Sequence, residues 1–312
     1  MHQKFYGFLY DFVFKYVFGR AQNAQLLSYL LNALLDRPKD NKITVIEILN
    51  PFNLKEFSGD KFSIVDVKAK DETGALFTIE VQLLTHSKFI QRSLYYMSKL
   101  YSSQIKDGEQ YSKLQKTIGI SIVNFELFNE EAEIHNVYKM FNEKSKALLT
   151  DDFELHFVEM PKFKLEKPHF LRTRFEKWLH VLKFGEILYI ADKELPEELR
   201  SEEGLIMAFE EMKKVNADSE LRYMMEARAQ AISTIATIEQ DYFNKGKIEG
   251  KIEGKIEGIA EGIAEGEIKG EIKGVVKGKI ELARELYRDG YPLEKLIEKT
   301  GFTAEQIIGN QP

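Results

Sequence analysis

Two carboxylates and an amide stand close together in a stretch whose pattern resembles a β-hairpin. Asp66, Glu80 and Gln82 lie within residues 61–84, KFSIVDVKAKDETGALFTIEVQLL. Side chains alternate between the two faces of a strand, so Glu80 and Gln82 are expected to share one face. If the hairpin turns about Thr73, Asp66 and Glu80 lie opposite each other, because both are seven residues from the turn.

Facing carboxylates repel, and like charges opposite each other destabilise a strand pair. A divalent cation between them would reverse the sign of this interaction. Carboxylate and amide oxygens suit Mg²⁺ or Mn²⁺. A purely structural alternative stays open, in which Asp66 ends a strand and Glu80 and Gln82 face solvent. A shift of one residue in the register would also separate the two carboxylates.

Basic and polar residues follow on the next predicted helix, residues 89–105. Arg92, Tyr96 and Lys99 are spaced by four and three, so they are expected to form one polar face near the carboxylates. Arg92 then either contacts a phosphate or forms a salt bridge on a solvated helix face. Gln104 lies about 3.3 turns beyond Arg92 and so not strictly on the same face.

Asp11 stands at the start of an apolar segment, residues 8–35, whose three- and four-residue spacing predicts a pair of helices. It either extends the acidic cluster or caps the first helix, and we favour the cap.

The remaining periodicity predicts a mixed α/β or α+β sheet domain followed by helices. Alternating or β-branched runs predict strands, and long apolar stripes predict helices. The expected strands are 43–49, 62–69, 76–84, 117–125 and 153–160, and the later helices are 169–188 and 202–240, separated by Pro196.

Composition narrows the function. The 312 residues are 44% hydrophobic, which excludes a wholly disordered chain, and the net charge of −6 argues against a protein that coats DNA by bulk charge. The chain has no cysteine, so disulfides, thiolate zinc sites and cysteine nucleophiles are excluded. No signal peptide or membrane-spanning stretch is recognised, so a cytoplasmic protein without membrane contact is expected.

Glycine recurs at every fourth position from Gly246 to Gly278. Nine glycines oppose an isolated helix by roughly 9 kcal/mol in total. Two interpretations remain, a helix that pairs within an oligomer and a flexible charged spacer. The pattern is not a phosphate-binding loop, because no strand precedes it and the lysine-serine/threonine ending is absent.

Residues 281–308 predict three short helices joined by turns at Asp289-Gly290 and Thr300-Gly301, similar to a helix-turn-helix. The mixed charge of this tail favours a packing or capping unit over DNA contact.

The same residues carry a family resemblance. Asp66 followed by Glu80-Val81-Gln82 resembles the D…(D/E)-x-K core of PD-(D/E)XK nucleases. The wider pattern is similar to the recombination-promoting nuclease (Rpn) family, or PD-(D/E)XK nuclease family transposases. The matching pieces are DFVFK (11–15), Phe18-Gly19, IVDVKAKD (64–71), IEVQ (79–82), Phe89, Arg92, Tyr95-Tyr96, Gln104, Gly108 and Tyr111.

This resemblance implies a restriction-endonuclease-like core, a mixed sheet flanked by helices, with a helical C-terminal extension. It implies Mg²⁺-dependent cleavage of DNA phosphodiester bonds, linked to recombination, transposition or mobile DNA. Asp66 and Glu80 would hold the metal, with the carbonyl of Val81 as a further ligand. Gln82 replaces the lysine of the wider superfamily and can orient water or phosphate, but it supplies no positive charge. Arg92, Lys99 and Gln104 are the candidate DNA-contacting residues.

Four segments are expected: a nuclease-like domain (1–165), a helical region (166–244), a glycine-repeat arm (245–280) and the helical tail (281–312). The arm favours a homo-oligomer, most simply a dimer, since cutting both strands of a duplex takes two active sites. The competing interpretation is a weak or inactive nuclease-fold protein that binds DNA or assembles oligomers. The glutamine at position 82 and the acidic net charge favour it.

Overall fold

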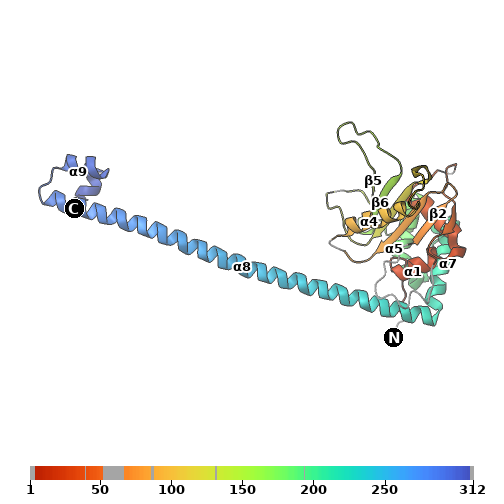
Figure 1. Cartoon of the computed structure of the whole chain (residues 1–312). Coiled ribbons are helices and arrows are strands. Elements are labelled where there is room, and N and C mark those ends of the chain that lie inside the picture. Colours follow the sequence, from red (N-terminus) through yellow and green to blue (C-terminus); the bar gives the residue numbers. More distant parts are fainter. Residues whose placement is uncertain are drawn as a thin grey trace. The chain divides into compact units, whose positions relative to one another are not determined.

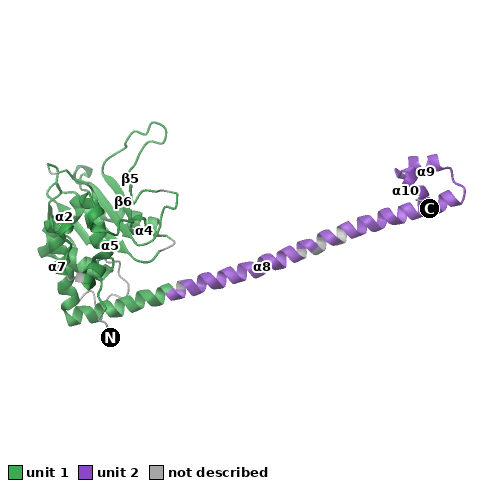
Figure 2. Cartoon of the chain, turned by 180° about the vertical axis from the view of Figure 1, so that it is seen from behind, with its two compact units in different colours: residues 1–236 green, residues 237–312 purple. Residues whose placement is uncertain are grey.

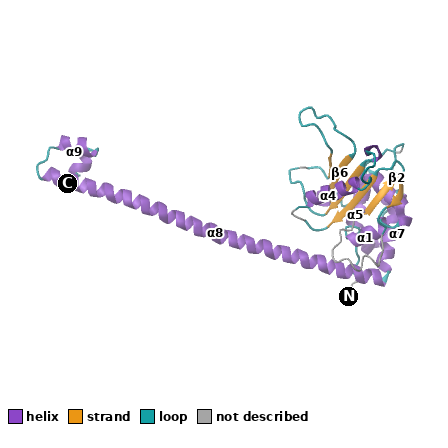
Figure 3. Ribbon diagram, in the orientation of Figure 1, coloured by secondary structure: helices purple, strands orange, loops and turns teal. Residues whose placement is uncertain are grey.

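The computed structural model describes residues 4–38, 40–51, 67–85, 88–130, 132–192 and 194–309. The chain divides into two compact units, residues 1–236 and 237–312 (Figure 2). The first unit contains both helices and strands, and the second is helical (Figures 1 and 3). The helices are α1 (Asp11–Phe18), α2 (Ala24–Leu34), α4 (Phe89–Ser102), α5 (Arg174–Asp192), α6 (Glu197–Arg200), α7 (Glu203–Ala217), α8 (Ser219–Arg288), α9 (Leu293–Thr300) and α10 (Ala304–Ile308).

A six-stranded mixed sheet forms the centre of the first unit, in the order β1-β2-β3-β4-β6-β5. β3, β4 and β6 run parallel to one another, whereas β1, β2 and β5 pair antiparallel with their neighbours. The strands are β1 (Val45–Ile48), β2 (Val67–Asp71), β3 (Leu76–Gln82), β4 (Thr117–Val123), β5 (His135–Tyr138) and β6 (Phe153–Glu159). The mixed sheet with flanking helices confirms the predicted fold class.

The β2–β3 hairpin has the register expected for a turn about Thr73. Val67 pairs with Ile79, and Ala69 pairs with Phe77. The carboxylate of Asp71 holds the turn by accepting hydrogen bonds from the backbone N–H groups of Thr73 and Ala75, both at 2.9 Å. Asp66, the first predicted acidic residue, lies outside the described residues, so the structure does not locate its carboxylate.

The two faces of the sheet are covered differently. The face that bears Phe77, Ile79 and Val81 belongs to the main hydrophobic core, which it shares with side chains of α1, α2, α5 and α7. The opposite face, which bears Glu80, is covered by α4 and by a smaller apolar cluster that includes Phe89, Met97, Val123, Leu155 and Phe157. Glu80 therefore lies beside the smaller core, under α4.

Two elements differ from the sequence-based expectation. The short edge strand β5, His135–Tyr138, was not predicted, because its sequence HNVY contains a single β-branched residue. The expected helix over residues 202–240 is broken between α7 and α8. Asp218 has an extended backbone there, and its carboxylate accepts hydrogen bonds from the N–H groups of Glu220 and Leu221.

In the second unit, α8 is helical throughout the glycine repeat. α9 and α10 follow turns at Gly290 and Gly301, both with a positive φ angle. Ala283, Leu296 and Ile307 form a small core between these elements. The two later short helices of the predicted tail are confirmed as α9 and α10, whereas the first is the end of the long helix α8. A capping box between Thr303 and Gln306 starts α10. Among the described residues, no helix is both long and apolar enough to cross a membrane.

Candidate active site

Glu80 is a buried carboxylate near the end of β3. Only 6% of its surface is exposed. The parallel register places Glu80 beside Ser121 of β4, and both side chains lie on the face covered by α4. Buried carboxylates are rare unless they are paired, so the partners of Glu80 define the chemistry of the site.

Two of the predicted site residues contact Glu80 directly. Gln82 donates a hydrogen bond from Nε2 to Oε1 of Glu80 at 2.7 Å. Arg92, one turn into α4, forms an ion pair with the same oxygen through Nη2. The guanidinium carbon of Arg92 lies 5.1 Å from the centre of the Phe89 ring, which supports it from the other side. The structure therefore joins Glu80, Gln82 and Arg92 in one cluster.

Burial raises the pKa of Glu80 above its ordinary value, because the charged form loses water. The positive charge of Arg92 and the hydrogen bonds from Gln82 and Arg92 lower the pKa but do not cancel the effect of burial. The carboxylate is thus held in an environment in which a nearby positive charge is strongly favourable.

Serine hydroxyls line the recess beside Glu80. Ser93 of α4 and Ser121 of β4 lie 3.4 Å apart, and both border a small recess together with Thr78, Glu80 and Tyr96. Sequence reasoning missed both serines. The signal was present in TIGISIV, since Gly119 and Ser121 alternate with three isoleucines and so mark the polar face of β4.

The oxygen donors at this site fit a hard divalent cation. Both hydrogen bonds that described residues donate to Glu80 reach Oε1, which leaves Oε2 for a further ligand. The carboxylate, the amide of Gln82 and the serine hydroxyls are donors of the kind that Mg²⁺ prefers. Within the part of the chain that the structure describes, no three His, Cys, Asp or Glu side chains are grouped so that they could hold a metal ion. A contribution from Asp66 stays a prediction. Val81 is buried in the main core, and ligation by its carbonyl stays a prediction.

Lys99 and Gln104 lie elsewhere on or beyond α4. Lys99 is exposed in the last turn of the helix. Gln104 exchanges hydrogen bonds with the backbone of Gln115 and donates to Thr117, at the start of β4. Thr117 is four residues before Ser121, so Gln104 lies toward the opposite end of that strand from Glu80. Its DNA contact stays a prediction.

Asp11 serves the start of α1 only in part as the favoured cap would, since its carboxylate accepts a hydrogen bond from the backbone N–H of Phe12 at 2.7 Å. Tyr10 occupies the N-cap position of α1 and forms no side-chain cap. Asp11 is the first residue of the helix, and its carboxylate forms a two-pronged ion pair with Arg228 of α8. This ion pair connects α1 to the beginning of α8. The interaction of Asp11 with Arg228 is therefore structural.

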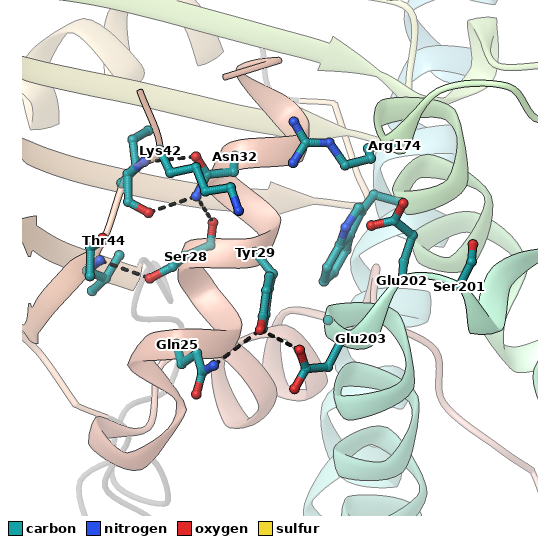
Figure 4. A pocket seen from close by; sticks show the side chains of 14 residues that line it. Gln25, Ser28, Tyr29, Asn32, Lys42, Thr44, Arg174, Ser201, Glu202 and Glu203 are labelled. Atoms are coloured by element: carbon teal, nitrogen blue, oxygen red, sulfur yellow. Dashed lines mark hydrogen bonds between the residues drawn. The ribbon is translucent and has the colours of Figure 1, made fainter. Parts of the chain in front are cut away.

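A larger cavity of about 730 Å³ lies between α2, the segment before β1, and the helices α5 and α7 (Figure 4). Its polar groups bond to one another. The hydroxyl of Tyr29 donates to Glu203 at 2.9 Å, and the amide of Asn32 donates to the carbonyl of Ile43 at 2.7 Å. Arg174 donates to the carbonyl of Arg37. These bonds join neighbouring elements, and we place the candidate active site at Glu80 instead.

The structure thus places three residues that carry the resemblance to PD-(D/E)XK nucleases, Glu80, Gln82 and Arg92, together at one face of a mixed sheet. Residues 8–240 match the family model of the PD-(D/E)XK nuclease family transposases. The chain therefore belongs to this family. The match includes every candidate site residue and ends before the glycine repeat. No curated protein and no solved structure matches the chain.

Proposed function

We propose that this protein is a Mg²⁺-dependent endonuclease that hydrolyses DNA phosphodiester bonds during recombination, transposition or the processing of mobile DNA. The observation that carries the proposal is the buried carboxylate of Glu80, held between Gln82 and Arg92 in a chain of a nuclease family. Desolvation makes a buried carboxylate costly even when a partly exposed cation is paired with it, so a function favours its presence more than stability does.

In this proposal Asp66 and Glu80 hold the cation, Mg²⁺ or Mn²⁺, with the carbonyl of Val81 as a further ligand. Asp66 directly precedes Val67, the residue that pairs with Ile79 in the hairpin, which supports a shared site with Glu80. A divalent cation held by these residues would supply a water of lowered pKa and positive charge for the phosphate.

The remaining residues position the reactants. Gln82 orients a water or a phosphate oxygen through its amide while it bonds to Glu80. Arg92 supplies the positive charge that Gln82 lacks, and its fork of N–H groups suits a phosphate oxygen pair. Lys99, which is exposed farther along α4, contacts the DNA backbone. Gln104 contacts DNA at the far end of the same surface.

Cleavage of supercoiled plasmid tests the proposal. Wild-type protein is expected to nick plasmid with Mg²⁺ or Mn²⁺ and not with EDTA. Asp66→Ala and Glu80→Gln are each expected to abolish nicking. Glu47→Gln is the matched control, because Glu47 is an exposed carboxylate on β1 of the same sheet. Equal nicking by wild type and both active-site variants would reject the site.

A non-catalytic function is the second candidate, and the glutamine at position 82 favours it. Lysine at this position would add a positive charge to the transition state, and its absence removes one source of catalysis. This candidate predicts a folded wild-type protein that binds DNA but does not cleave it with any metal, and a Gln82→Lys variant that gains activity.

We further propose that the protein is a homo-oligomer, most simply a dimer, assembled through the repeat arm. Two active sites would then serve the two strands of a duplex. A monomeric mass by light scattering at tens of micromolar protein would reject the oligomer and leave the nuclease proposal untouched.

A further inference from the structure

The part of α8 within the second unit carries an unpartnered row of apolar side chains. Its members recur at every fourth residue, and each is between 41% and 61% exposed; they are Ile248, Ile252, Ile256, Ile272 and Val276. We call this set the isoleucine row. Exposed apolar residues repeated along one helix indicate a surface that another chain covers.

Charged residues flank the isoleucine row on both sides, and their signs change along the helix. The four-residue register of this row holds alanine at 260 and 264. The position after each member of the register is acidic first and basic later: Glu249, Glu253, Glu257, Glu261 and Glu265, then Lys269, Lys273 and Lys277. The charged positions before the register have the opposite order, Lys247, Lys251 and Lys255, then Glu267 and Glu271, with apolar residues at 259, 263 and 275. The sequence changes from KIEG to EIKG near Gly262.

Within one helix this arrangement is unfavourable. Residues four apart are neighbours, so each row places like charges side by side along several turns. The ion pairs in this segment join only the ends of the acidic and basic runs: Lys245 to Glu249, Glu265 to Lys269, and Lys277 to Glu281. Among the described residues, Glu253, Glu257 and Lys273 form no ion pair. Cations and anions from another chain would relieve this repulsion.

We propose that the repeat arm pairs with the arm of a second copy in the antiparallel direction, centred on Gly262. This pairing sets Ile248 against Val276 and Ile252 against Ile272, since each pair lies symmetrically about residue 262. The acidic run at 249–257 then meets the basic run at 269–277 of the partner. On the other flank, the lysines at 251 and 255 meet the glutamate at 271.

The change of sign distinguishes the antiparallel pair from a parallel one. Charged positions that flank an apolar seam set the orientation of helix pairs. In a parallel pair, the row of charges that follows the isoleucines faces the row that precedes them on the partner helix. An unbroken KIEG repeat would be just as complementary in that orientation. In an antiparallel pair, each row faces the same row of the partner helix, which runs in the opposite direction. An unbroken repeat would then oppose glutamate to glutamate, and only the change to EIKG makes the pair complementary.

Helix geometry also predicts the handedness with which the two helices wrap around each other. Four residues turn about 400°, so the isoleucine row drifts by about 40° in each repeat. A period longer than 3.6 residues favours a right-handed crossing or supercoil. The two helices must therefore wrap around each other in a right-handed supercoil to keep the isoleucine row between them along its length.

Distance measurements between spin labels test this arrangement in the full-length protein. The chain has no cysteine, so a single introduced cysteine gives one label per copy. Gly250, Gly262 and Gly274 are suitable sites, because open space surrounds the position of an added Cβ at each. Gly262→Cys is expected to give a short distance between copies. Gly250→Cys alone is expected to give at least about 36 Å, because twenty-four residues of helical rise separate the two labels along the axis.

The outcomes separate this inference from the oligomer proposed above, on which it rests. A 1:1 mixture of labelled Gly250→Cys and Gly274→Cys is expected to add a short distance that neither variant gives alone. A short distance for Gly250→Cys alone would show a parallel pair and overturn the inference while keeping the dimer. The absence of any distance between copies for Gly262→Cys would reject both.

Charge reversal provides a second measurement, independent of labels. Changing Glu249, Glu253 and Glu257 to lysine is expected to weaken dimerisation roughly tenfold or more in sedimentation. Reversing Lys269, Lys273 and Lys277 to glutamate in the same chain is expected to restore it. In a parallel pair the second set of changes would weaken the dimer further. Such additional weakening would overturn the antiparallel arrangement.

Discussion

Arg92 and Glu80 form an ion pair that joins α4 to β3 at the floor of the candidate active site. Of the two roles that the sequence left open for Arg92, phosphate contact and salt bridge, the structure contains the salt bridge. Its partner is the carboxylate expected to bind metal. The guanidinium thus supplies the positive charge that a buried carboxylate requires.

Replacing Arg92 by alanine leaves Glu80 buried without its cation. We expect Arg92→Ala to lower the free energy of unfolding by about 3 kcal/mol, at the low end for a broken buried pair because Glu80 can take up a proton instead. Trp178, the single tryptophan, is buried in the first unit and reports its unfolding in urea by fluorescence.

Lys113→Ala is the matched control for this loss. Lys113 forms an exposed ion pair with Glu109, and such pairs contribute less than about 1 kcal/mol. If Arg92→Ala and Lys113→Ala lower the free energy of unfolding equally, burial of Glu80 does not strengthen its ion pair with Arg92.

Metal binding at Glu80 is expected to strengthen as the pH rises. Burial raises the pKa of Glu80, so protons compete with a cation over the range between its ordinary value of 4.5 and the raised value. Without metal, the contribution of Glu80 to stability is present below pH 4.5 and is lost as the pH rises through the raised pKa. Stabilisation against urea by excess Mg²⁺ should therefore be larger at pH 8 than at pH 5. A difference that persists in Glu80→Gln would place the effect at another site.

Periodicity predicted the fold well where one face of an element is apolar. The alternation in residues 76–82 fixes which side chains enter the main core, so the β2–β3 register followed from the pattern and the turn at Thr73. Strand β5 was missed because HNVY contains a single β-branched residue, whereas the equally short edge strand β1 has the sequence VIEI.

Contacts between distant residues could not be predicted in the same way. Asp11 and Arg228 are 217 positions apart, and no spacing rule joins them. The predicted helix through residue 218 failed for a local reason, since the Asp218 side chain bonds to the backbone ahead of it and favours a helix start over a helix interior. Ser93 and Ser121 enter the site only through packing of α4 on β4.

The first unit is expected to lose stability in mild acid through His135. Burial and the neighbouring His156 lower the pKa of His135 from 6.5 to about 4. A histidine with a depressed pKa contributes stability above pH 6.5, and this contribution is lost as the pH falls toward 4. The full shift corresponds to about 3 kcal/mol.

His135→Gln isolates this effect, because glutamine can hydrogen-bond to His156 but does not titrate. The drop in unfolding free energy between pH 7 and pH 4 should be about 3 kcal/mol smaller in this variant than in wild type. His169→Gln, at an exposed histidine, serves as the control. If wild type and His135→Gln lose the same stability, the acid sensitivity comes from other groups.

Two glycines in helices are expected to respond oppositely to alanine. A Cβ on Gly204 of α7 would lie 2.6 Å from Cβ of Tyr29 and 2.9 Å from Cζ2 of Trp178, so the packed side chains must move. Gly204→Ala should therefore destabilise the first unit by about 2 kcal/mol, because the extra methyl group overpacks the core.

Open space surrounds Gly254 in the repeat, and Gly254→Ala should stabilise the helix by about 1 kcal/mol through helix propensity alone. Urea unfolding followed by Trp178 fluorescence measures the first change, and the thermal loss of helical circular dichroism measures the second. A neutral Gly204→Ala would mean that α7 can move away from α2 without cost, whereas a destabilising Gly254→Ala would mean that the glycine face of the arm, and not its isoleucine row, is in close contact with another chain.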